Sequence, residues 1–234
     1  GFTAWGTFAQ YVRIENADFN LVNLPQKIDF VSAAGLGCRF MTAFHGIVNQ
    51  GKVDNNMYVA VHGCGGVGLS AVMIASAYGA KVIAVDILEE NLTKARSFGA
   101  DITINASKEE VVETIKGISQ GGANVSMDAL GSHETTLNSI ACLAKKGKHI
   151  QIGILGKEDE IAVSTANLIA NEIEIIGSHG MPIADYEVIF KLIEDNKIDL
   201  GLLIDRTVRL EDVPGELLNM DNYSNSGMVV IDRF

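Results

Sequence analysis

Three glycines at a fixed spacing are the residues of this sequence that most clearly indicate a ligand-binding loop. Gly63, Gly65 and Gly68 follow the short apolar run 58–62, and an alanine-rich apolar run at 67–78 comes next. The order strand, glycine turn, helix is typical of a loop that binds the pyrophosphate of a dinucleotide. The first glycine allows the tight turn, the second lets the backbone approach the phosphates, and the third lets the helix pack closely on the strand. The helix N-terminus then offers free N–H groups and a partial positive charge.

An acidic residue at the end of the next predicted strand supports this interpretation. Asp86 lies 23 residues after Gly63, close to the spacing of roughly 20 residues expected for an acid that binds the adenosine ribose. A carboxylate there accepts hydrogen bonds from the ribose hydroxyls and repels a 2′-phosphate. Ile87 and Leu88 follow, with no arginine to hold such a phosphate. The pattern therefore favours NAD over NADP. The alternative is an ordinary strand–helix–strand unit whose glycines serve only packing.

The elements that must position these residues alternate regularly between strand and helix from residue 57 onward. The predicted strands are 57–62, 81–86, 101–105, 125–129, 148–153 and 173–177, and the predicted helices are 66–79, 89–98, 108–119, 133–145 and 183–195. We expect a capping box at 107–110 to open the third of these helices. Such alternation predicts an α/β fold with a doubly wound, six-stranded parallel sheet of the Rossmann type.

The two ends of the chain have a different pattern. An alternating run predicts a strand at 7–14. The stretch 30–49 is rich in Ala and Gly, and its apolar residues at helical spacing predict a helix in two pieces, broken near Gly35 and Gly37. The tail predicts a strand at 206–210, a short helix at 211–220 and a final strand at 227–232. We therefore expect a nucleotide-binding domain at 41–205, interrupting a second unit built from 1–40 and 206–234.

Composition excludes several classes of partner. The chain of 234 residues has a net charge of −11 and a pI of about 4.8, and it has no block of basic residues, so nucleic acid and anionic membrane surfaces are not expected partners. No apolar run approaches the roughly 18 residues of a membrane span, and no signal peptide is visible. Cys38, Cys64 and Cys142 form no C-x-x-C pair, which favours a reducing cytoplasm.

Five stretches of the chain match motifs of one known family. They are 6–12 (GTFAQYV), 33–44 (AAGLGCRFMTAF), 61–69 (VHGCGGVGL), 126–131 (SMDALG) and 148–153 (KHIQIG). Together they resemble the zinc-type medium-chain alcohol dehydrogenases, and the resemblance spans the whole chain. It implies a Rossmann domain with NAD bound at Gly63, Gly65, Gly66, Val67, Gly68 and Asp86. It also implies hydride transfer between NAD and a small alcohol or aldehyde, and a homo-oligomer (a dimer or a tetramer).

The same resemblance assigns roles to residues around the glycine turn. It makes Cys38 a catalytic zinc ligand and places Thr42 against the nicotinamide. It also places Gly131 and Ser132 near the adenosine half, Gly153 and Ile154 near the carboxamide, and Ser178 near the nicotinamide. Each has a plainer alternative. Free cysteine often packs as a small hydrophobe, a helical threonine can bond to its own backbone, and glycine is common where a strand turns into a helix.

The remaining polar candidates have structural interpretations. We expect His62, His149, Cys64 and Cys142 to pack in or beside the core, and Asp128 to be a hydrogen-bonding group rather than a catalyst. His179 follows the sixth predicted strand and is expected to be a solvated loop histidine rather than a proton relay.

Other parts of the family pattern have no counterpart here. The resemblance makes 1–40 a remnant and 206–234 a return segment of a GroES-like catalytic domain. Most of that domain, with its other zinc ligands and its structural-zinc cysteines, is not matched, so the chain is expected to be a fragment, a truncated product or a processed chain. Zinc is then expected only in the complete enzyme, because a catalytic zinc needs three protein ligands. Exposure of Cys38, Phe40 and Phe44 next to the missing domain would favour self-association.

Two other functions stay open at this point. A gene that had lost its catalytic domain could encode an inactive NAD-binding module or sensor. A methyltransferase that uses S-adenosylmethionine also has a glycine turn and an acid at the end of the second strand, but it would leave the flanking family motifs as coincidence.

Overall fold

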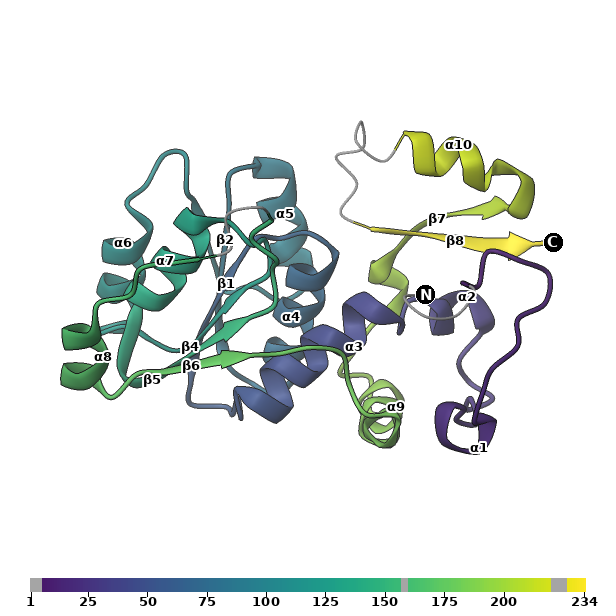
Figure 1. The fold of residues 1–234 in the computed structure, drawn as a ribbon, viewed down its shortest axis with the longest axis horizontal. Coiled ribbons are helices and arrows are strands. Elements are labelled where there is room, and N and C mark those ends of the chain that lie inside the picture. Colours follow the sequence, from purple (N-terminus) through teal and green to yellow (C-terminus); the bar gives the residue numbers. More distant parts are fainter. Residues whose placement is uncertain (1–5, 157–159, 220–226) are drawn as a thin grey trace. The chain divides into compact units, whose positions relative to one another are not determined.

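A computed structural model describes residues 6–156, 160–219 and 227–234. The chain forms two compact units (Figure 1). The sheet unit comprises residues 38–181, and the split unit combines residues 1–37 with 182–234. All of the predicted cofactor-binding residues belong to the sheet unit.

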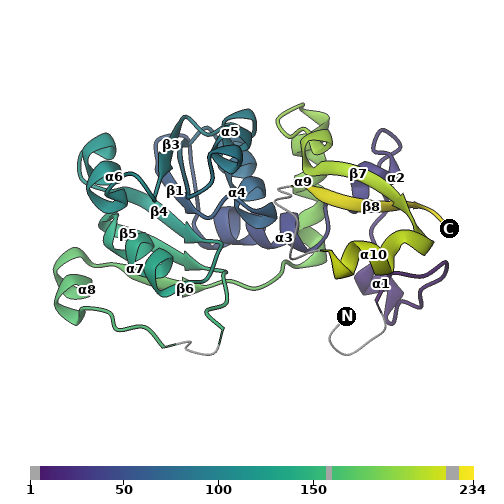
Figure 2. The ribbon, with the colours of Figure 1, turned by 90° about the horizontal axis from the view of Figure 1, so that it is seen from above.

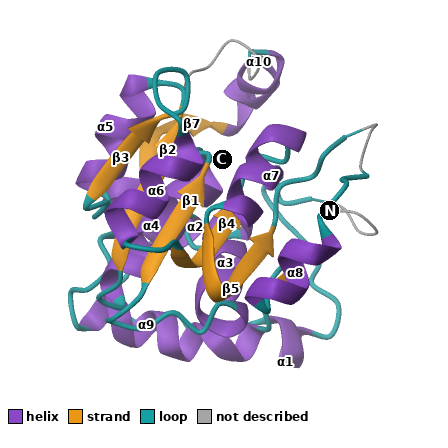
Figure 3. Cartoon of the chain, turned by 90° about the vertical axis from the view of Figure 1, so that its left-hand side faces the viewer, coloured by secondary structure: helices purple, strands orange, loops and turns teal. Residues whose placement is uncertain are grey.

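The sheet unit is built on six parallel strands (Figure 3). They are β1 (Tyr58–His62), β2 (Lys81–Asp86), β3 (Ile102–Asn105), β4 (Ala123–Asp128), β5 (Leu143–Gln151) and β6 (Glu174–Gly177). Their order across the sheet is β3-β2-β1-β4-β5-β6, so the strand order reverses between β1 and β4. This topology confirms the predicted doubly wound α/β fold. In such sheets ligands bind outside the carboxyl ends of the strands, at the point of reversal.

Helices cover both faces of the sheet (Figure 2). One layer contains α3 (Cys38–Phe44), the π-helical segment η1 (His45–Gln50), α4 (Gly66–Ala77) and α5 (Glu89–Ser97). The other contains α6 (Val111–Ser119) and α7 (His133–Ala141), and α8 (Thr165–Asn171) lies beside β5. The central strands are buried on both faces, as continuous apolar runs such as VIAV in β2 require.

The two faces of the sheet differ in chemistry. Beneath the first layer of helices the contacts are apolar, because Met127 and Ile150 pack closely against Gly46 of η1. Beneath α7 the buried side chains include Ser126, Asp128 and His149. One face is therefore an ordinary hydrophobic core, and the other contains buried polar groups that need partners.

The split unit joins the two ends of the chain. It contains α1 (Ala17–Asn20), α2 (Phe30–Ala34), η2 (Ile183–Asp185), α9 (Tyr186–Glu194), η3 (Leu200–Leu203), β7 (Ile204–Arg209), η4 (Leu210–Asp212), α10 (Val213–Leu218) and β8 (Met228–Arg233). Strands β7 and β8 pair in parallel, and α2 packs against both of them. The Tyr186 hydroxyl donates a hydrogen bond of 2.9 Å to the Leu36 carbonyl oxygen, which ties the two segments together.

Most predicted elements are present, but the strand at 7–14 and the capping box at 107–110 are not observed, and one helix was missed. Residues 7–14 form no strand, because no neighbouring strand pairs with them, and Phe8 and Tyr11 are exposed. The helix predicted at 108–119 begins at Val111 with no side-chain cap. The Ser107 hydroxyl instead donates 2.6 Å to Asn105 Oδ1, so 107–110 is not a capping box. Helix α8, whose cap is the Ser164 hydroxyl, was not predicted.

The break in the helix predicted at 30–49 is confirmed: α2 ends at Ala34 and α3 begins at Cys38. The predicted exposure of Phe40 and Phe44 is wrong, since both side chains are buried, and α3 packs along α4. Over the described part of the chain, no helix is both long enough and apolar enough to cross a lipid bilayer.

Candidate cofactor-binding site

The glycine turn joins β1 to α4 at the carboxyl edge of the sheet, and each glycine in it has a distinct geometric role. Gly63 has a φ of +89°, and its N–H donates 2.8 Å to the Val85 carbonyl oxygen of β2. A Cβ at Gly68 would overlap the carbonyl group of Gly63, so α4 packs directly on the turn. A Cβ at Gly65 would meet nothing within 4 Å. The fold therefore requires glycine at 63 and 68, whereas at 65 it leaves open space above the backbone.

The N-terminus of α4 has the electrostatics of an anion site. Gly65 is its N-cap residue, no side chain caps it, and its first turn contains no acidic residue. Backbone N–H groups of Gly66 and Val67 lie in this first turn, where no intrahelical acceptor exists for them. The side chain of Arg39, from the start of α3, lies over Gly66: a Cβ there would be 2.9 Å from Arg39 Nη1.

Asp86 binds the same turn from the end of β2. Its Oδ2 accepts a hydrogen bond of 2.8 Å from the Cys64 N–H and one of 3.2 Å from Asn91 Nδ2. Its Oδ1 accepts 2.9 Å from the Leu88 N–H. A carboxylate can accept about four hydrogen bonds, so Asp86 holds the turn and keeps capacity for a further donor.

Asp128, at the end of β4, organises the loops that follow β4 and β5. Its Oδ1 accepts hydrogen bonds from the Leu130 N–H at 2.9 Å and the Gly131 N–H at 3.0 Å. Its backbone carbonyl accepts 2.9 Å from the Gly153 N–H. Gly131 and Gly153 are thereby brought into direct backbone contact, so close that a Cβ on Gly153 would overlap the Gly131 nitrogen. The structural role predicted for Asp128 is confirmed.

A buried chain of polar groups supports Asp128 from below. The Thr136 hydroxyl donates 2.6 Å to Asp128 Oδ2, and Gln151 Nε2 donates 3.0 Å to the same oxygen. Gln151 Oε1 lies 2.8 Å from His149 Nε2, and His149 Nδ1 lies 2.8 Å from the Ser139 hydroxyl. Burial is the largest single influence on Asp128 and raises its pKa. The hydrogen bonds that Asp128 accepts from Thr136, Gly131, Gln151 and Leu130 together outweigh burial and lower the pKa below its ordinary value.

Both core histidines are neutral at physiological pH. Burial lowers the pKa of His62 to about 4, and burial also lowers the pKa of His149. His62 Nε2 lies 3.7 Å from Cys142 Sγ, and burial raises the pKa of that thiol to about 11. Burial likewise raises the pKa of the Cys64 thiol. The predicted core positions of these four residues are confirmed, and none of them is poised for acid–base or nucleophilic chemistry.

Three other predicted site residues lie along the same edge. Ser132 caps α7, its hydroxyl accepting a hydrogen bond of 3.1 Å from the Thr135 N–H. The side chain of Ile154 is 85% exposed. The Ser178 N–H donates 3.0 Å to the Gln151 carbonyl oxygen, and its hydroxyl oxygen is buried with no hydrogen-bond partner. A buried polar atom without a partner is rare, so Ser178 is a position where a ligand donor or acceptor would be satisfied.

Large apolar side chains are exposed at this edge. Ile87 and Leu88 follow β2, Leu130 follows β4 and Ile154 follows β5, with exposures of 63%, 47%, 61% and 85%. Backbone donors, an acid and surrounding apolar surface make a chemically mixed edge that suits a ligand with phosphates, sugar hydroxyls and flat rings.

Comparison with known proteins agrees with this geometry. Residues 66–195 match the model of the zinc-binding dehydrogenases. The chain belongs to this family. Its sequence is 31% identical over 228 residues to an NAD-dependent alcohol dehydrogenase of Sulfurisphaera tokodaii, an alignment that covers 97% of this chain and 64% of that protein. The chain thus spans less than two thirds of the length of that relative.

Solved structures place the fold in the same group. The benzyl alcohol dehydrogenase of Acinetobacter calcoaceticus aligns with a TM-score of 0.84 and 25% identity, over 92% of this chain and 60% of that one. An alcohol dehydrogenase from Thermus sp. ATN1 aligns with a TM-score of 0.88 over 97% of this chain and 65% of that one. At 24% identity, the second match supports the fold alone.

Two further predicted site residues, Cys38 and Thr42, lie on α3. Cys38 is exposed at the start of α3 and forms no disulfide. Thr42, one helical turn later, is buried. Within the described residues, no three His, Cys, Asp or Glu side chains are grouped so that they could hold a metal ion. These residues do not fit a catalytic zinc by themselves, because such a site needs three protein ligands.

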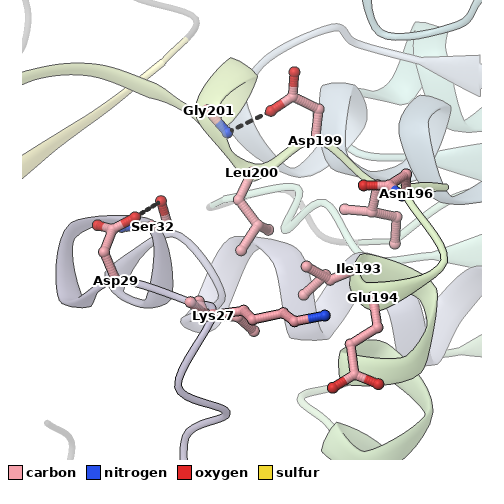
Figure 4. Close-up of a pocket in the computed structure, with 11 residues that line it drawn as sticks. Lys27, Asp29, Ser32, Ile193, Glu194, Asn196, Asp199, Leu200 and Gly201 are labelled. Atoms are coloured by element: carbon pink, nitrogen blue, oxygen red, sulfur yellow. Dashed lines mark hydrogen bonds between the residues drawn. The ribbon is translucent and has the colours of Figure 1, made fainter.

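A separate pocket lies within the split unit (Figure 4). It has a volume of about 530 Å³ and is lined by Lys27, Asp29, Ser32, Glu194, Asp199 and neighbours. Two of its carboxylates accept hydrogen bonds from backbone N–H groups a few residues later in the chain. Asp29 accepts one of 2.9 Å from the Ser32 N–H, and Asp199 accepts one of 2.9 Å from the Gly201 N–H. These acids therefore act as local caps.

Sequence reasoning missed several residues that shape the site. Thr136 and Gln151 both donate to Asp128. Gln151 lies inside the stretch 148–153, but that pattern does not pair it with Asp128, and the three residues meet only because α7 packs on β4 and β5. Arg39 stands next to Cys38 in the sequence, and only the packing of α3 on α4 brings it to the glycine turn.

Proposed function

We propose that this chain is the NAD-binding portion of an NAD-dependent zinc-type alcohol dehydrogenase. The observation that carries the proposal is the open backbone at Gly65 beside the uncapped N-terminus of α4, with Asp86 bound to the same turn. The name of the Sulfurisphaera relative, an NAD-dependent alcohol dehydrogenase, supports the same cofactor and reaction class.

Each part of the edge has a task in this proposal. The N–H groups of Gly66 and Val67 bind the pyrophosphate, aided by the helix dipole. Asp86 accepts hydrogen bonds from the adenosine ribose hydroxyls. Gly131 and Ser132 border the adenosine half, and Gly153 and Ile154 border the carboxamide. The unpartnered Ser178 hydroxyl and Thr42 are placed on the nicotinamide side.

The bound nicotinamide would supply the hydride chemistry, and the chain would supply orientation. The backbone contact between Gly131 and Gly153 holds two of the proposed contact loops in fixed relation, which lowers the entropic cost of aligning the ring. The substrate class is a small alcohol or the corresponding aldehyde. Zinc belongs to the complete protein in this proposal, with Cys38 as one ligand.

The test has two parts. Titration of the purified 234-residue chain with NADH, followed by nicotinamide fluorescence, should show saturable binding at one site per chain. A panel of primary and secondary alcohols with NAD and added zinc should show no turnover. Absence of NADH binding would overturn the cofactor assignment. Zinc-dependent turnover by the homogeneous chain would overturn the assignment of catalysis to the complete protein.

A further inference from the structure

The side chain of Arg39 lies over Gly66 in the glycine turn. A Cβ placed on Gly66 would lie 2.5 Å from Arg39 Cδ, 2.9 Å from Nη1 and 3.1 Å from Nε. The aliphatic stem and the guanidinium therefore both lie directly over the first residue of α4. Because Gly66 has no side chain, the Arg39 side chain can occupy the space next to its Cα.

The position of Arg39 is set by helix packing. It is the second residue of α3, and α3 packs along α4. The residue is half-buried, so its stem is held against the backbone. An arginine fixed in this way loses little conformational freedom when it binds a ligand.

The first turn of α4 has the chemistry of an anion site. The first turn of α4 contains no acidic residue and no side chain caps it. A guanidinium presents five N–H donors in a planar fork that matches phosphate oxygens, and such charge-assisted bonds are roughly twice as strong as neutral ones. Backbone N–H groups alone would approach a pyrophosphate from one side, and Arg39 adds a cation.

We infer that Arg39 is a pyrophosphate-binding residue, which clamps the diphosphate of the dinucleotide against the N-terminus of α4. This inference rests on the proposed function and deepens it. Arg39 binds the part of the ligand that carries its negative charge, and it has no role in distinguishing the sugar or the rings.

The test compares ligands with and without the diphosphate. Arg39→Met keeps an apolar stem on Gly66 and removes the charge, whereas Arg39→Lys keeps a charge without the fork. Loss of a hydrogen bond to a charged group corresponds to roughly 10- to 100-fold in affinity. We expect Arg39→Met to weaken binding of NADH and ADP-ribose by about that factor and to leave the binding of adenosine, measured by competition, unchanged. Arg39→Lys should recover part of the loss.

A matched control is available at the opposite edge of the sheet. Arg96, near the end of α5, donates to the Thr103 hydroxyl near the start of β3, so Arg96→Met makes the same charge change away from the turn. It should leave NADH binding unchanged. The inference is overturned if Arg39→Met binds NADH like the wild type, or if NADH and adenosine weaken equally. If the wild-type chain itself does not bind NADH, the proposed function and the inference fail together.

Discussion

Gly131 and Gly153 lie backbone against backbone where the chain leaves β4 and β5. A Cβ on Gly131 would be 2.5 Å from the Ile154 nitrogen, and one on Gly153 would overlap Gly131. Both N–H groups are held by Asp128, one by its side chain and the other by its carbonyl. The contact requires two small residues at once, and it fixes the distance between two loops at the carboxyl edge of the sheet.

Substitution Gly153→Ala is expected to destabilise the fold. The new methyl group would meet backbone atoms that cannot rotate away, so we expect the free energy of unfolding to fall by about 2–3 kcal/mol, measured by urea denaturation. Gly177→Ala is the control, because a Cβ there meets nothing within 4 Å at the end of β6. Equal stability of the two variants would contradict the backbone contact.

Substitution Gly65→Ala should separate binding from stability. Its φ of −78° suits alanine, and the space around it is open, so we expect stability to change by no more than about 0.5 kcal/mol. The methyl group would project where the pyrophosphate approaches, and NADH affinity should fall by about tenfold or more. Thermal melting and NADH titration of the same sample check both parts.

Gly117→Ala in α6 is the control for Gly65→Ala, since its Cβ also meets nothing within 4 Å. It should leave NADH affinity unchanged and slightly stabilise the helix. A Gly65→Ala variant that binds NADH as tightly as Gly117→Ala would show that the ligand does not approach this backbone.

Asp86 is expected to set the preference between the two dinucleotides. Asp86→Asn removes the negative charge that would face a 2′-phosphate, so the ratio of NADH to NADPH affinity should fall, by about tenfold for 1.4 kcal/mol of lost discrimination. Asp101→Asn is the matched control. Asp101 also accepts a backbone N–H, that of Val82 at 2.9 Å, but at the opposite end of β2. If both variants keep the wild-type ratio, Asp86 does not bind the ribose.

The buried, neutral His62 is expected to make the free energy of unfolding fall in mild acid. Burial lowers the pKa of His62 from its ordinary value of 6.5 to about 4 in the fold, so between these values the unfolded chain binds a proton that the folded chain does not. The free energy of unfolding therefore falls as the pH drops from about 6.5 towards 4, by about 2 kcal/mol for this residue between pH 7 and 5. The lowered pKa of His149 adds a loss of the same sign.

The variant His62→Gln isolates this contribution. Urea denaturation at pH 7 and pH 5 should show a smaller difference for the variant than for the wild type. The Cys142 thiol beside His62 stays protonated in this range because burial raises its pKa to about 11. An identical pH dependence in the two proteins would mean that His62 does not stay neutral in the fold.

The sequence predicted the sheet well because its strands are continuous apolar runs separated by clear turns. Six strands and the helix break near Gly35 were found, and the carboxyl-end positions of Gly63, Asp86 and Asp128 followed from them. The strand expected at 7–14 failed because alternation indicates a strand only if a partner strand pairs with it. The capping box expected at 107–110 failed for a local reason, because the Ser107 hydroxyl bonds to Asn105, two residues earlier, rather than capping the helix.

The supports of the site could not be predicted from local patterns. Gln151, Thr136 and Asp128 are 8–23 positions apart and converge only when α7 packs on the sheet. The same holds for Arg39 and Gly66, which belong to different helices. Side chains that hold a site together from beneath have no required spacing in sequence, whereas the glycine turn that contacts the ligand does.

The most direct test of the central claim is a crystal structure of the chain with NADH bound. The account predicts the pyrophosphate within hydrogen-bond distance of the Gly66 and Val67 N–H groups, and the adenosine ribose hydroxyls on the Asp86 carboxylate. Density for NADH away from the carboxyl edge of β1 and β2, or a glycine turn left empty at saturating NADH, would contradict it.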